Sequence, residues 1–273
     1  MDASDCVSTD PLSARKRAAL VGPRVSRRLL GQRVDVTDYA RASQAILALA
    51  EARAGGMVCA STVHMLMEGH DDPDFRRLVN AADLITSDGM PLVWMLRALG
   101  VPEATRVYGP DLTPIVCGEA AERGIAVGFY GSSEDVQDDL AGALVARHPG
   151  LRIGFRWSPP FEPLSPEEDE QVVEAIQDSG IGVLFVGLGC PKQERWMAAH
   201  RERVDCVLVG VGAAFDFVAG RKPKAPAWLQ RAGLEWAFRL ACEPRRLWWR
   251  YARHNPRFAA LAAAQLWREW TDT

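Results

Sequence analysis

The chain lacks the features that mark a membrane-spanning or secreted protein. No stretch approaches the roughly 18 consecutive apolar residues of a transmembrane helix, and the basic N-terminal segment is not followed by the apolar run of a signal peptide. Six cysteines lie far apart, with no C-x-x-C pair: Cys6, Cys59, Cys117, Cys190, Cys206 and Cys242. Isolated cysteines are typical of reduced thiols. We therefore expect a cytoplasmic protein that meets a membrane only at its surface.

Zinc and dinucleotide patterns are also missing. The histidines show no zinc-type spacing with one another or with the cysteines, so the sequence predicts no metal and no cofactor. Gly210-x-Gly212-x-x-Phe215 lacks the third glycine of G-x-G-x-x-G, and no full βαβ unit follows it. The sequence therefore gives only weak support to a nucleotide-binding oxidoreductase, which we keep as an alternative function.

The small net charge conceals a division of the chain. The 273 residues carry a formal net charge of −3, which argues against nucleic-acid binding. Residues 1–220 hold 21 Lys and Arg against 31 Asp and Glu, whereas residues 221–273 hold 11 against 4. Six of the nine tryptophans lie in this basic tail: Trp228, Trp236, Trp248, Trp249, Trp267 and Trp270. The tail therefore differs in chemistry from the rest of the protein.

The order of apolar runs predicts an α/β fold. We expect strands at 57–61, 83–86, 125–130, 151–155, 181–186 and 206–211, with amphipathic helices between them. Continuous apolar strands separated by helices indicate a Rossmann-like parallel sheet with helices on both faces. Residues 1–30 are predicted to be a mobile leader, 31–220 the core, and 221–273 a helical appendage. In the appendage, we expect one helix over 244–254 and a second over 256–270. Asn255 would be the N-cap of the second helix, and Pro256 its first residue.

Polar and glycine clusters follow several predicted strands at their carboxyl ends. Residues 87–89 (SDG), 131–133 (GSS), 187–194 (GLGCPKQE) and 210–216 (GVGAAFD) are examples. In a parallel sheet these ends share one crevice, where helix N-termini favour phosphate groups. The sequence therefore predicts a nucleotide or another phosphorylated ligand.

Two polar residues of these clusters allow two interpretations each. Asp88 is either the N-cap of the following helix or a partly buried general base at the mouth of the crevice. Gln193 either lies in an ordinary exposed first turn or hydrogen-bonds sugar hydroxyls. Cys190 is a less favoured nucleophile, because no histidine lies nearby in sequence. The local sequence does not separate these alternatives.

Six motifs in order resemble the WecG/TagA/CpsF family of bacterial glycosyltransferases. They are residues 82–91 (ADLITSDGMP), 106–112 (RVYGPDL), 128–131 (GFYG), 187–196 (GLGCPKQERW), 210–220 (GVGAAFDFVAG) and the closing motif from Gly233 to Tyr251. The resemblance runs from about Val34 to about Tyr251. It implies an inverting, metal-independent transferase. Such enzymes move a hexose or N-acetylhexosamine-type sugar from a UDP-sugar to a polyprenyl-diphosphate-linked sugar in surface polysaccharide synthesis.

The resemblance also implies roles for individual residues. Asp88 would be the general base, Arg106 would meet charge on the substrate, and Gln193 would hydrogen-bond the donor sugar. Glycines would let UDP approach the backbone, and Asp216 would contact a ribose or uracil hydroxyl or simply form a turn. These glycines are Gly187, Gly189, Gly210 and Gly212. In many members of the family the Asn of a Thr-x-Asn motif is associated with a contact to the sugar. Thr62 stands at the position of this Asn, so the contact cannot be assigned directly to Thr62.

The tail gains an expected role from the same resemblance. Arg239, Arg246 and Arg250 would neutralise the diphosphate leaving group, or alternatively would pair with acidic residues or solvent. Trp and Arg together also suit an interface with anionic lipid, so we expect a peripheral membrane protein, and the apolar tail makes a homo-oligomer an option. Asp71-Asp72-Pro73-Asp74 looks like a D-x-D metal motif, but its position after a helical stretch favours a turn and a helix over 74–82. A non-catalytic membrane-associated scaffold of this fold is the third hypothesis.

Overall fold

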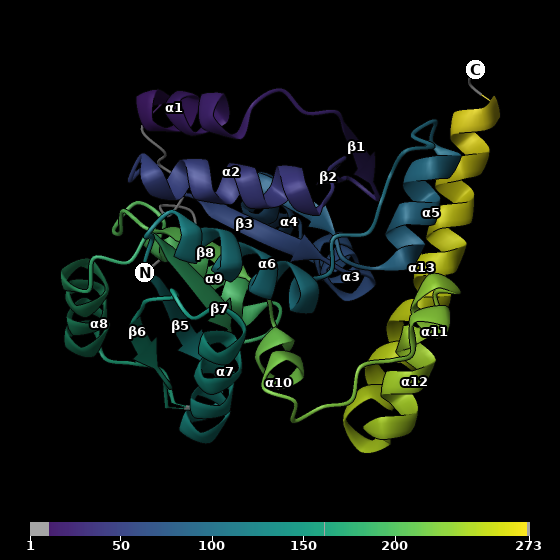
Figure 1. Cartoon of the computed structure of the whole chain (residues 1–273). Helices are drawn as coiled ribbons and strands as arrows, with labels where there is room; N and C mark the ends of the chain where they lie inside the picture. The colour runs from purple at the N-terminus through teal and green to yellow at the C-terminus, as the bar shows by residue number, and fades with distance from the viewer. Residues whose placement is uncertain (1–10, 161, 272–273) are drawn as a thin grey trace.

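A six-stranded parallel sheet forms the centre of the protein. The structure, a computed structural model, describes residues 11–160 and 162–271 (Figure 1). The strand order is β4-β3-β8-β7-β5-β6. The strands are β3 (Met57–Ser61), β4 (Leu84–Ser87), β5 (Val127–Gly131), β6 (Ile153–Trp157), β7 (Val183–Gly187) and β8 (Val207–Gly210). Each predicted strand is present with its ends displaced by at most two residues, so the predicted α/β class is confirmed.

Helices cover both faces of the sheet because successive strand residues point in opposite directions. On β7, Val183 and Phe185 join one buried cluster, whereas Leu184 and Val186 join the other. The first cluster includes residues of α2 (Tyr39–Glu51), α6 (Gly109–Glu122), α7 (Glu134–Arg147) and α10 (Ala214–Val218). The second includes residues of α4 (Pro73–Asn80), α8 (Pro166–Asp178) and α9 (Lys192–His200). The near-continuous apolar strands reflect this two-sided burial.

The N-terminal segment takes part in the fold over its described residues. Residues 1–10 of the expected mobile leader lie outside the described residues. The remainder holds α1 (Pro11–Val21) and β1 (Ser26–Leu29), which pairs antiparallel with β2 (Gln32–Asp35). Arg17 of α1 is only 1% exposed and its guanidinium lies 3.1 Å from Asp83 and 2.9 Å from Glu202. The buried pair with Asp83 joins α1 to the start of β4, and the half-buried pair with Glu202 joins it to the turn after α9, a role that the local composition did not predict.

The C-terminal helix packs along the side of the core. The tail contains α11 (Ala227–Arg231), α12 (Glu235–Cys242) and α13 (Pro244–Thr271). Phe258 and Ala262 of α13 are buried with Leu66 of α3 (Val63–Asp71) and Leu92 of α5 (Met90–Ala98). In Figure 1, α13 runs beside α5 and away from the sheet. The appendage thus shares a hydrophobic cluster with the core.

The predicted break at Asn255-Pro256 is wrong, because α13 continues through Pro256. A proline inside a helix removes one backbone hydrogen bond, at a cost of about 3 kcal/mol. His254 and Phe258, on either side of Pro256, are both buried against the core. Arg257 also makes two hydrogen bonds to Asp71, at 2.9 and 2.6 Å. Tertiary packing therefore keeps the helix intact where local sequence favoured a new start.

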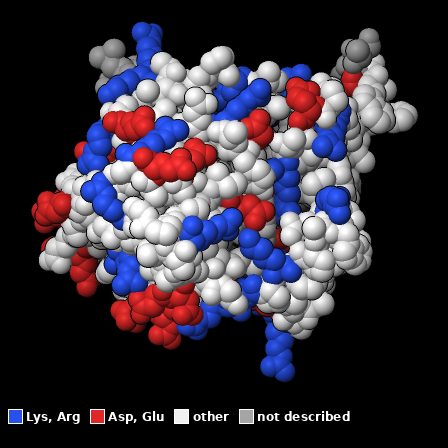
Figure 2. All heavy atoms as spheres, in the orientation of Figure 1, with Lys and Arg blue, Asp and Glu red and all other residues white. Residues whose placement is uncertain are grey.

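None of the helices in the described part of the chain is long and apolar enough to span a membrane. The charged side chains have a clear distribution on the face shown in Figure 2. Basic groups gather along the junction between the sheet core and the C-terminal helices, and acidic groups gather over α7. The junction is therefore the electropositive part of this face.

Candidate active site

Asp88 lies just after β4, at the carboxyl edge of the sheet. Its backbone N–H donates to the carbonyl of Ser61, the last residue of the neighbouring strand, at 2.9 Å. Its carboxylate does not cap α5, whose N-cap is Gly89. Instead, Oδ2 accepts a hydrogen bond from the backbone N–H of Gly109, in the first turn of α6, at 3.0 Å. The N-cap interpretation of Asp88 is thus wrong for its own helix.

The surroundings of Asp88 raise its pKa to about 6. Burial is the largest cause, because it disfavours the charged form, and the side chain keeps only 14% exposure. Arg106 and the Gly109 hydrogen bond act in the opposite direction, while Glu235 raises the pKa further. Near neutral pH the carboxylate is therefore largely ionised but still basic enough to accept a proton.

Arg106 connects Asp88 to the C-terminal helices. Its Nε donates to the carbonyl oxygen of Asp88, and its Nη2 lies 3.8 Å from the Asp88 carboxylate. The same Nη2 donates to Glu235 at 2.6 Å, and Nη1 donates to Gln230 at 3.3 Å. The guanidinium also lies over the Tyr108 ring, 3.9 Å from its centre. Arg106 was expected to meet substrate charge, but the structure shows its hydrogen bonds directed to the protein.

Gln193 lies on the same edge and ties two glycine turns together. Its Oε1 accepts from the backbone N–H of Gly189 at 3.2 Å and from that of Gly212 at 3.0 Å. A Cβ built on Gly109 would lie 3.3 Å from the carbonyl of Val211, directly before Gly212. Asp88 and Gln193 are therefore linked through the neighbouring backbones of Gly109 and Gly212. The amide oxygen of Gln193 is occupied by hydrogen bonds from the protein.

Glu194 is a buried residue whose contribution the sequence analysis missed. Its side chain has 0% exposure, and Oε1 accepts from Nε2 of Gln193 at 2.7 Å. This contact orients the Gln193 amide, because it turns the NH2 group away and leaves the oxygen facing the two glycine N–H groups. Burial raises the pKa of Glu194. In the sequence, only the adjacent Gln193-Glu194 pair in the first turn of the helix could have indicated this contact. An exposed first turn can have the same residues, so the burial of the pair was needed to recognise it.

The predicted ligand-facing glycines fall into two groups. Gly189 and Gly212 have positive φ values of 80° and 55°, and a Cβ built on either would meet no backbone within 4 Å. At Gly187, by contrast, a Cβ would lie 2.7 Å from the ring of Phe215, and at Gly210 it would lie 2.6 Å from Met197. Side chains therefore pack over Gly187 and Gly210 in the direction that a Cβ would take. Only Gly189 and Gly212 leave space above the backbone.

Three other predicted residues have local structural partners. Thr62 is the N-cap of α3, and its hydroxyl accepts from the N–H of Met65 at 3.3 Å. Asp216 lies 3.5 Å from Lys222. Asp72 caps α4 by accepting from the N–H groups of Asp74 and Phe75. The predicted turn and helix start in the Asp71–Asp74 segment is therefore confirmed.

The tail arginines differ in their surroundings. Arg246 pairs with Glu243 at 2.6 Å and is 53% exposed. Arg239 and Arg250 each have a buried Nε without a hydrogen-bond partner. Burial lowers the pKa of Arg250, and the nearby charges of Arg239 and Arg246 lower it further. Two partly buried guanidiniums that repel each other form a site that favours an added anion.

Cysteine chemistry is not favoured at this edge. The five cysteines within the described residues are free thiols, as predicted, and Cys6 lies outside them. Burial raises the pKa of Cys190, and the Glu194 carboxylate raises it further. The thiolate needed for nucleophilic attack is therefore suppressed.

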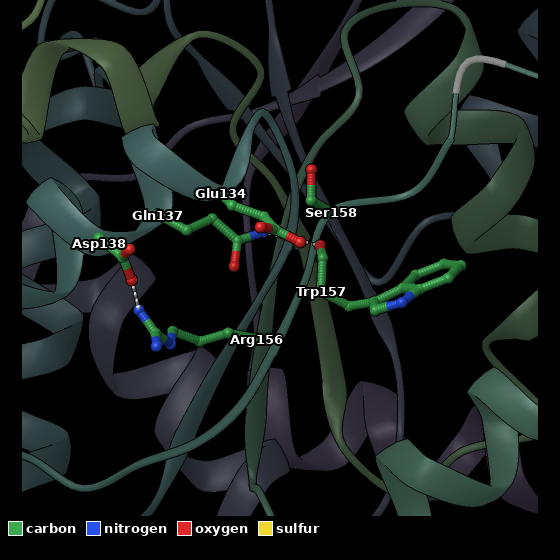
Figure 3. Close-up of a pocket in the computed structure, with 6 residues that line it drawn as sticks. All are labelled: Glu134, Gln137, Asp138, Arg156, Trp157 and Ser158. Atoms are coloured by element: carbon green, nitrogen blue, oxygen red, sulfur yellow. Dashed lines mark hydrogen bonds and ion pairs between the residues drawn. The ribbon is translucent and has the colours of Figure 1, made fainter.

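A separate polar pocket lies at the far side of the sheet, between the start of α7 and the end of β6 (Figure 3). Gln137 donates to the carbonyls of Gly131 and Trp157, and Arg156 pairs with Asp138 at 2.6 Å. The pocket lies beside β5 and β6, at the opposite end of the strand order from β4, which Asp88 follows. None of the predicted site residues lines this pocket.

The fold and site define an open parallel α/β protein with a candidate general base at the carboxyl edge of its sheet. The chain belongs to the WecG/TagA/CpsF family of glycosyl transferases, since the sequence model of this family matches residues 27–272. It is similar to the N-acetylglucosaminyldiphosphoundecaprenol N-acetyl-beta-D-mannosaminyltransferase of Bacillus spizizenii. The two are 27% identical over 205 residues, which cover 75% of this chain and 77% of that protein. The protein is therefore a glycosyltransferase, as the motifs predicted.

Proposed function

We propose that this glycosyltransferase moves a hexose or N-acetylhexosamine-type sugar from a UDP-sugar to a polyprenyl-diphosphate-linked sugar. The activity for which the Bacillus relative is named, transfer of N-acetylmannosamine to a lipid-diphosphate-linked N-acetylglucosamine, supports this donor and acceptor class. The single observation that carries the mechanism is the place of Asp88, a largely buried carboxylate at the carboxyl edge of the sheet, where burial raises its pKa. The product would enter surface polysaccharide synthesis.

The proposed reaction is a single displacement with inversion. The Asp88 carboxylate takes the proton from the acceptor hydroxyl as that oxygen attacks the anomeric carbon of the donor sugar. The bond from the anomeric carbon to the UDP oxygen breaks, and UDP leaves with the electron pair. The hydrogen bond from Gly109 fixes Oδ2, which leaves Oδ1 as the oxygen that would accept the proton.

Cationic side chains would stabilise the charge that develops on UDP, with no divalent ion at the diphosphate. The buried Nε groups of Arg239 and Arg250 have no partner, so an incoming diphosphate would satisfy them. The acidic residues of the Asp71–Asp74 segment already have partners, since Asp71 binds Arg257, Asp72 caps α4 and Asp74 contacts Arg77. Their engagement supports transfer without a D-x-D metal. Gly189 and Gly212 would allow UDP to lie near the backbone.

The C-terminal helices would bring the active site to the membrane surface where a lipid-linked acceptor resides. Trp228 of α11 and Trp248 and Trp249 of α13 are exposed at 62%, 54% and 62%. Tryptophan rings at this exposure suit the headgroup region of a bilayer, and nearby arginines suit anionic lipid. This supports a peripheral association through the tail.

The decisive experiment replaces the proposed base. Asp88→Asn keeps the size of the side chain but removes the proton acceptor, so transfer should fall by about 10²–10⁴-fold. UDP release from several UDP-sugars would be measured with a short-chain lipid-diphosphate acceptor. UDP affinity, measured by calorimetry, should change little. Unchanged turnover in Asp88→Asn would reject the general-base assignment.

A further inference from the structure

Three potential metal ligands from two separate helices meet where α13 packs on α3. His64 and Glu68 are one turn apart on α3, and His254 reaches them from α13. The ligand atoms of the three side chains all lie within 4.8 Å of one another. The sequence shows no metal-binding spacing here, because His64 and His254 are 190 positions apart in the chain.

The separations between these groups suit a shared ion better than direct hydrogen bonds. Nε2 of His64 lies 3.3 Å from Oε1 of Glu68, and Nε2 of His254 lies 3.7 Å from the same oxygen. The longer distance exceeds the usual hydrogen-bond range for N–H···O, and the shorter one lies at its upper end. Ligand atoms about 2.0–2.1 Å from a tetrahedral zinc ion are roughly 3.3 Å apart. Small side-chain shifts would therefore bring all three atoms onto one ion.

The burial of His254 also favours a metal. The residue is 5% exposed, and its Nδ1 has no hydrogen-bond partner. The protein therefore does not hold the ring through Nδ1, and an ion bound by Nε2 would give this buried imidazole a partner.

We propose that His64, Glu68 and His254 bind a zinc ion that joins α13 to α3. Two imidazoles and one carboxylate are a ligand set used by zinc, and the fourth position would be taken by water. Calcium and magnesium are disfavoured because they prefer oxygen ligands. Among the charged groups around the cluster, Arg250, Arg253 and Arg257 oppose a cation, whereas Asp71 pairs with Arg257 and lies 3.8 Å from Arg253. The charge of Glu68 and the metal–ligand bonds offset this repulsion.

The site would also fix the position of Arg250. This arginine lies one turn before His254 on α13, and its charge acts on His64. His64 in turn follows Thr62 and Ser61, whose carbonyl holds the backbone of Asp88. A bound zinc ion would thus hold the turn that carries Arg250 against the segment next to Asp88. This consequence rests on the proposed function, whereas zinc binding itself does not.

Direct metal binding by the full-length protein tests the proposal. The protein would be stripped with a chelator and titrated with Zn²⁺ by calorimetry, and Co²⁺ would report ligand type and geometry by absorption. We expect one ion per chain, a tetrahedral cobalt spectrum without thiolate charge transfer, and a rise in Tm of about 5 °C at saturating zinc. Thiolate bands would instead assign the ion to cysteine and overturn the site.

Matched variants make the test specific. His64→Gln, Glu68→Gln and His254→Gln should each weaken zinc binding by at least about 100-fold, since each removes a direct ligand. His70→Gln on the same helix is the control, because His70 lies outside the cluster, and it should bind as the unsubstituted protein does. Circular dichroism would show which variants are folded. Equal zinc affinity in folded His64→Gln and in the control would overturn the proposal, whatever the result for Asp88→Asn.

Discussion

The guanidinium of Arg106 donates to the carboxylate of Glu235 at 2.6 Å, so a core residue and a tail residue form one partly buried ion pair. The same guanidinium lies 3.8 Å from the carboxylate of Asp88. Glu235 therefore competes with Asp88 for the only positive charge within ion-pair distance of Asp88 among the described residues. This arrangement makes the acidity of the proposed base depend on the position of the tail.

The pH dependence of transfer should follow the ionisation of Asp88. Its pKa is raised to about 6, and a general base works only in the deprotonated form. We therefore expect kcat/KM to fall about tenfold for each pH unit well below pH 6 and to level off above pH 7. A profile measured between pH 4.5 and 8.5 would check this. A profile that stays flat down to pH 4.5 contradicts the assignment.

Removing Glu235 should move that profile. The Glu235 charge raises the pKa of Asp88, so Glu235→Gln should lower this pKa and shift the acid limb to lower pH. Arg106 would also be released toward Asp88, which acts in the same direction. Glu51→Gln, an exposed change on α2, is the matched control and should leave the limb in place. A shift to higher pH in Glu235→Gln would contradict this role.

Loss of the two tail arginines whose Nε has no hydrogen-bond partner should slow transfer. Arg239→Gln and Arg250→Gln remove charges proposed to stabilise the leaving UDP, so each should lower kcat by about 10²–10³-fold. Arg268→Gln, near the exposed end of α13, is the control and should retain full activity. Rates would be measured as UDP release at saturating donor. If Arg239→Gln and Arg250→Gln match the control, the leaving-group role is wrong.

Packing of α13 on the core should contribute measurably to stability. Phe258 is 7% exposed in the cluster that includes residues of α3 and α5. Phe258→Ala should lower the free energy of unfolding by about 3 kcal/mol, because it leaves a cavity and loses buried apolar surface. Trp267 on the same helix is 69% exposed, and Trp267→Ala should change stability by only about 0.5 kcal/mol. Urea unfolding would compare the two, and equal values would contradict the docked position of α13.

Exposed tryptophans should govern binding to vesicles. Replacing Trp248 and Trp249 by Ala removes two rings exposed at 54% and 62%, and binding to anionic vesicles should fall roughly tenfold for each. Val145→Ala on α7 removes an exposed apolar group remote in sequence from the tail and should have little effect. Sedimentation with phosphatidylglycerol-containing vesicles would measure this. Equal binding by the double variant and Val145→Ala would reject membrane contact through these rings.

The amino-acid sequence by itself determined the parallel sheet and the edge at which polar residues gather. Continuous apolar strands cannot be buried on both faces unless helices cover both, so the α/β class follows from composition and order. The motif around Asp88 also placed a carboxylate after a strand, where a parallel sheet offers a ligand site. These are local properties, which is why they were predictable.

Tertiary structure alone decided what the polar side chains contact. Asp88 accepts a hydrogen bond from Gly109, 21 positions later, and Arg106 is held by Glu235 across 129 positions. The helix α13 continues through Pro256 because the core buries residues on both sides of it. His64 and His254 meet for the same reason. Contacts between distant segments arise from packing of the whole chain, and no spacing within one segment encodes them. The basic, tryptophan-rich tail was visible in the sequence, but its link to the candidate base through Arg106 was not.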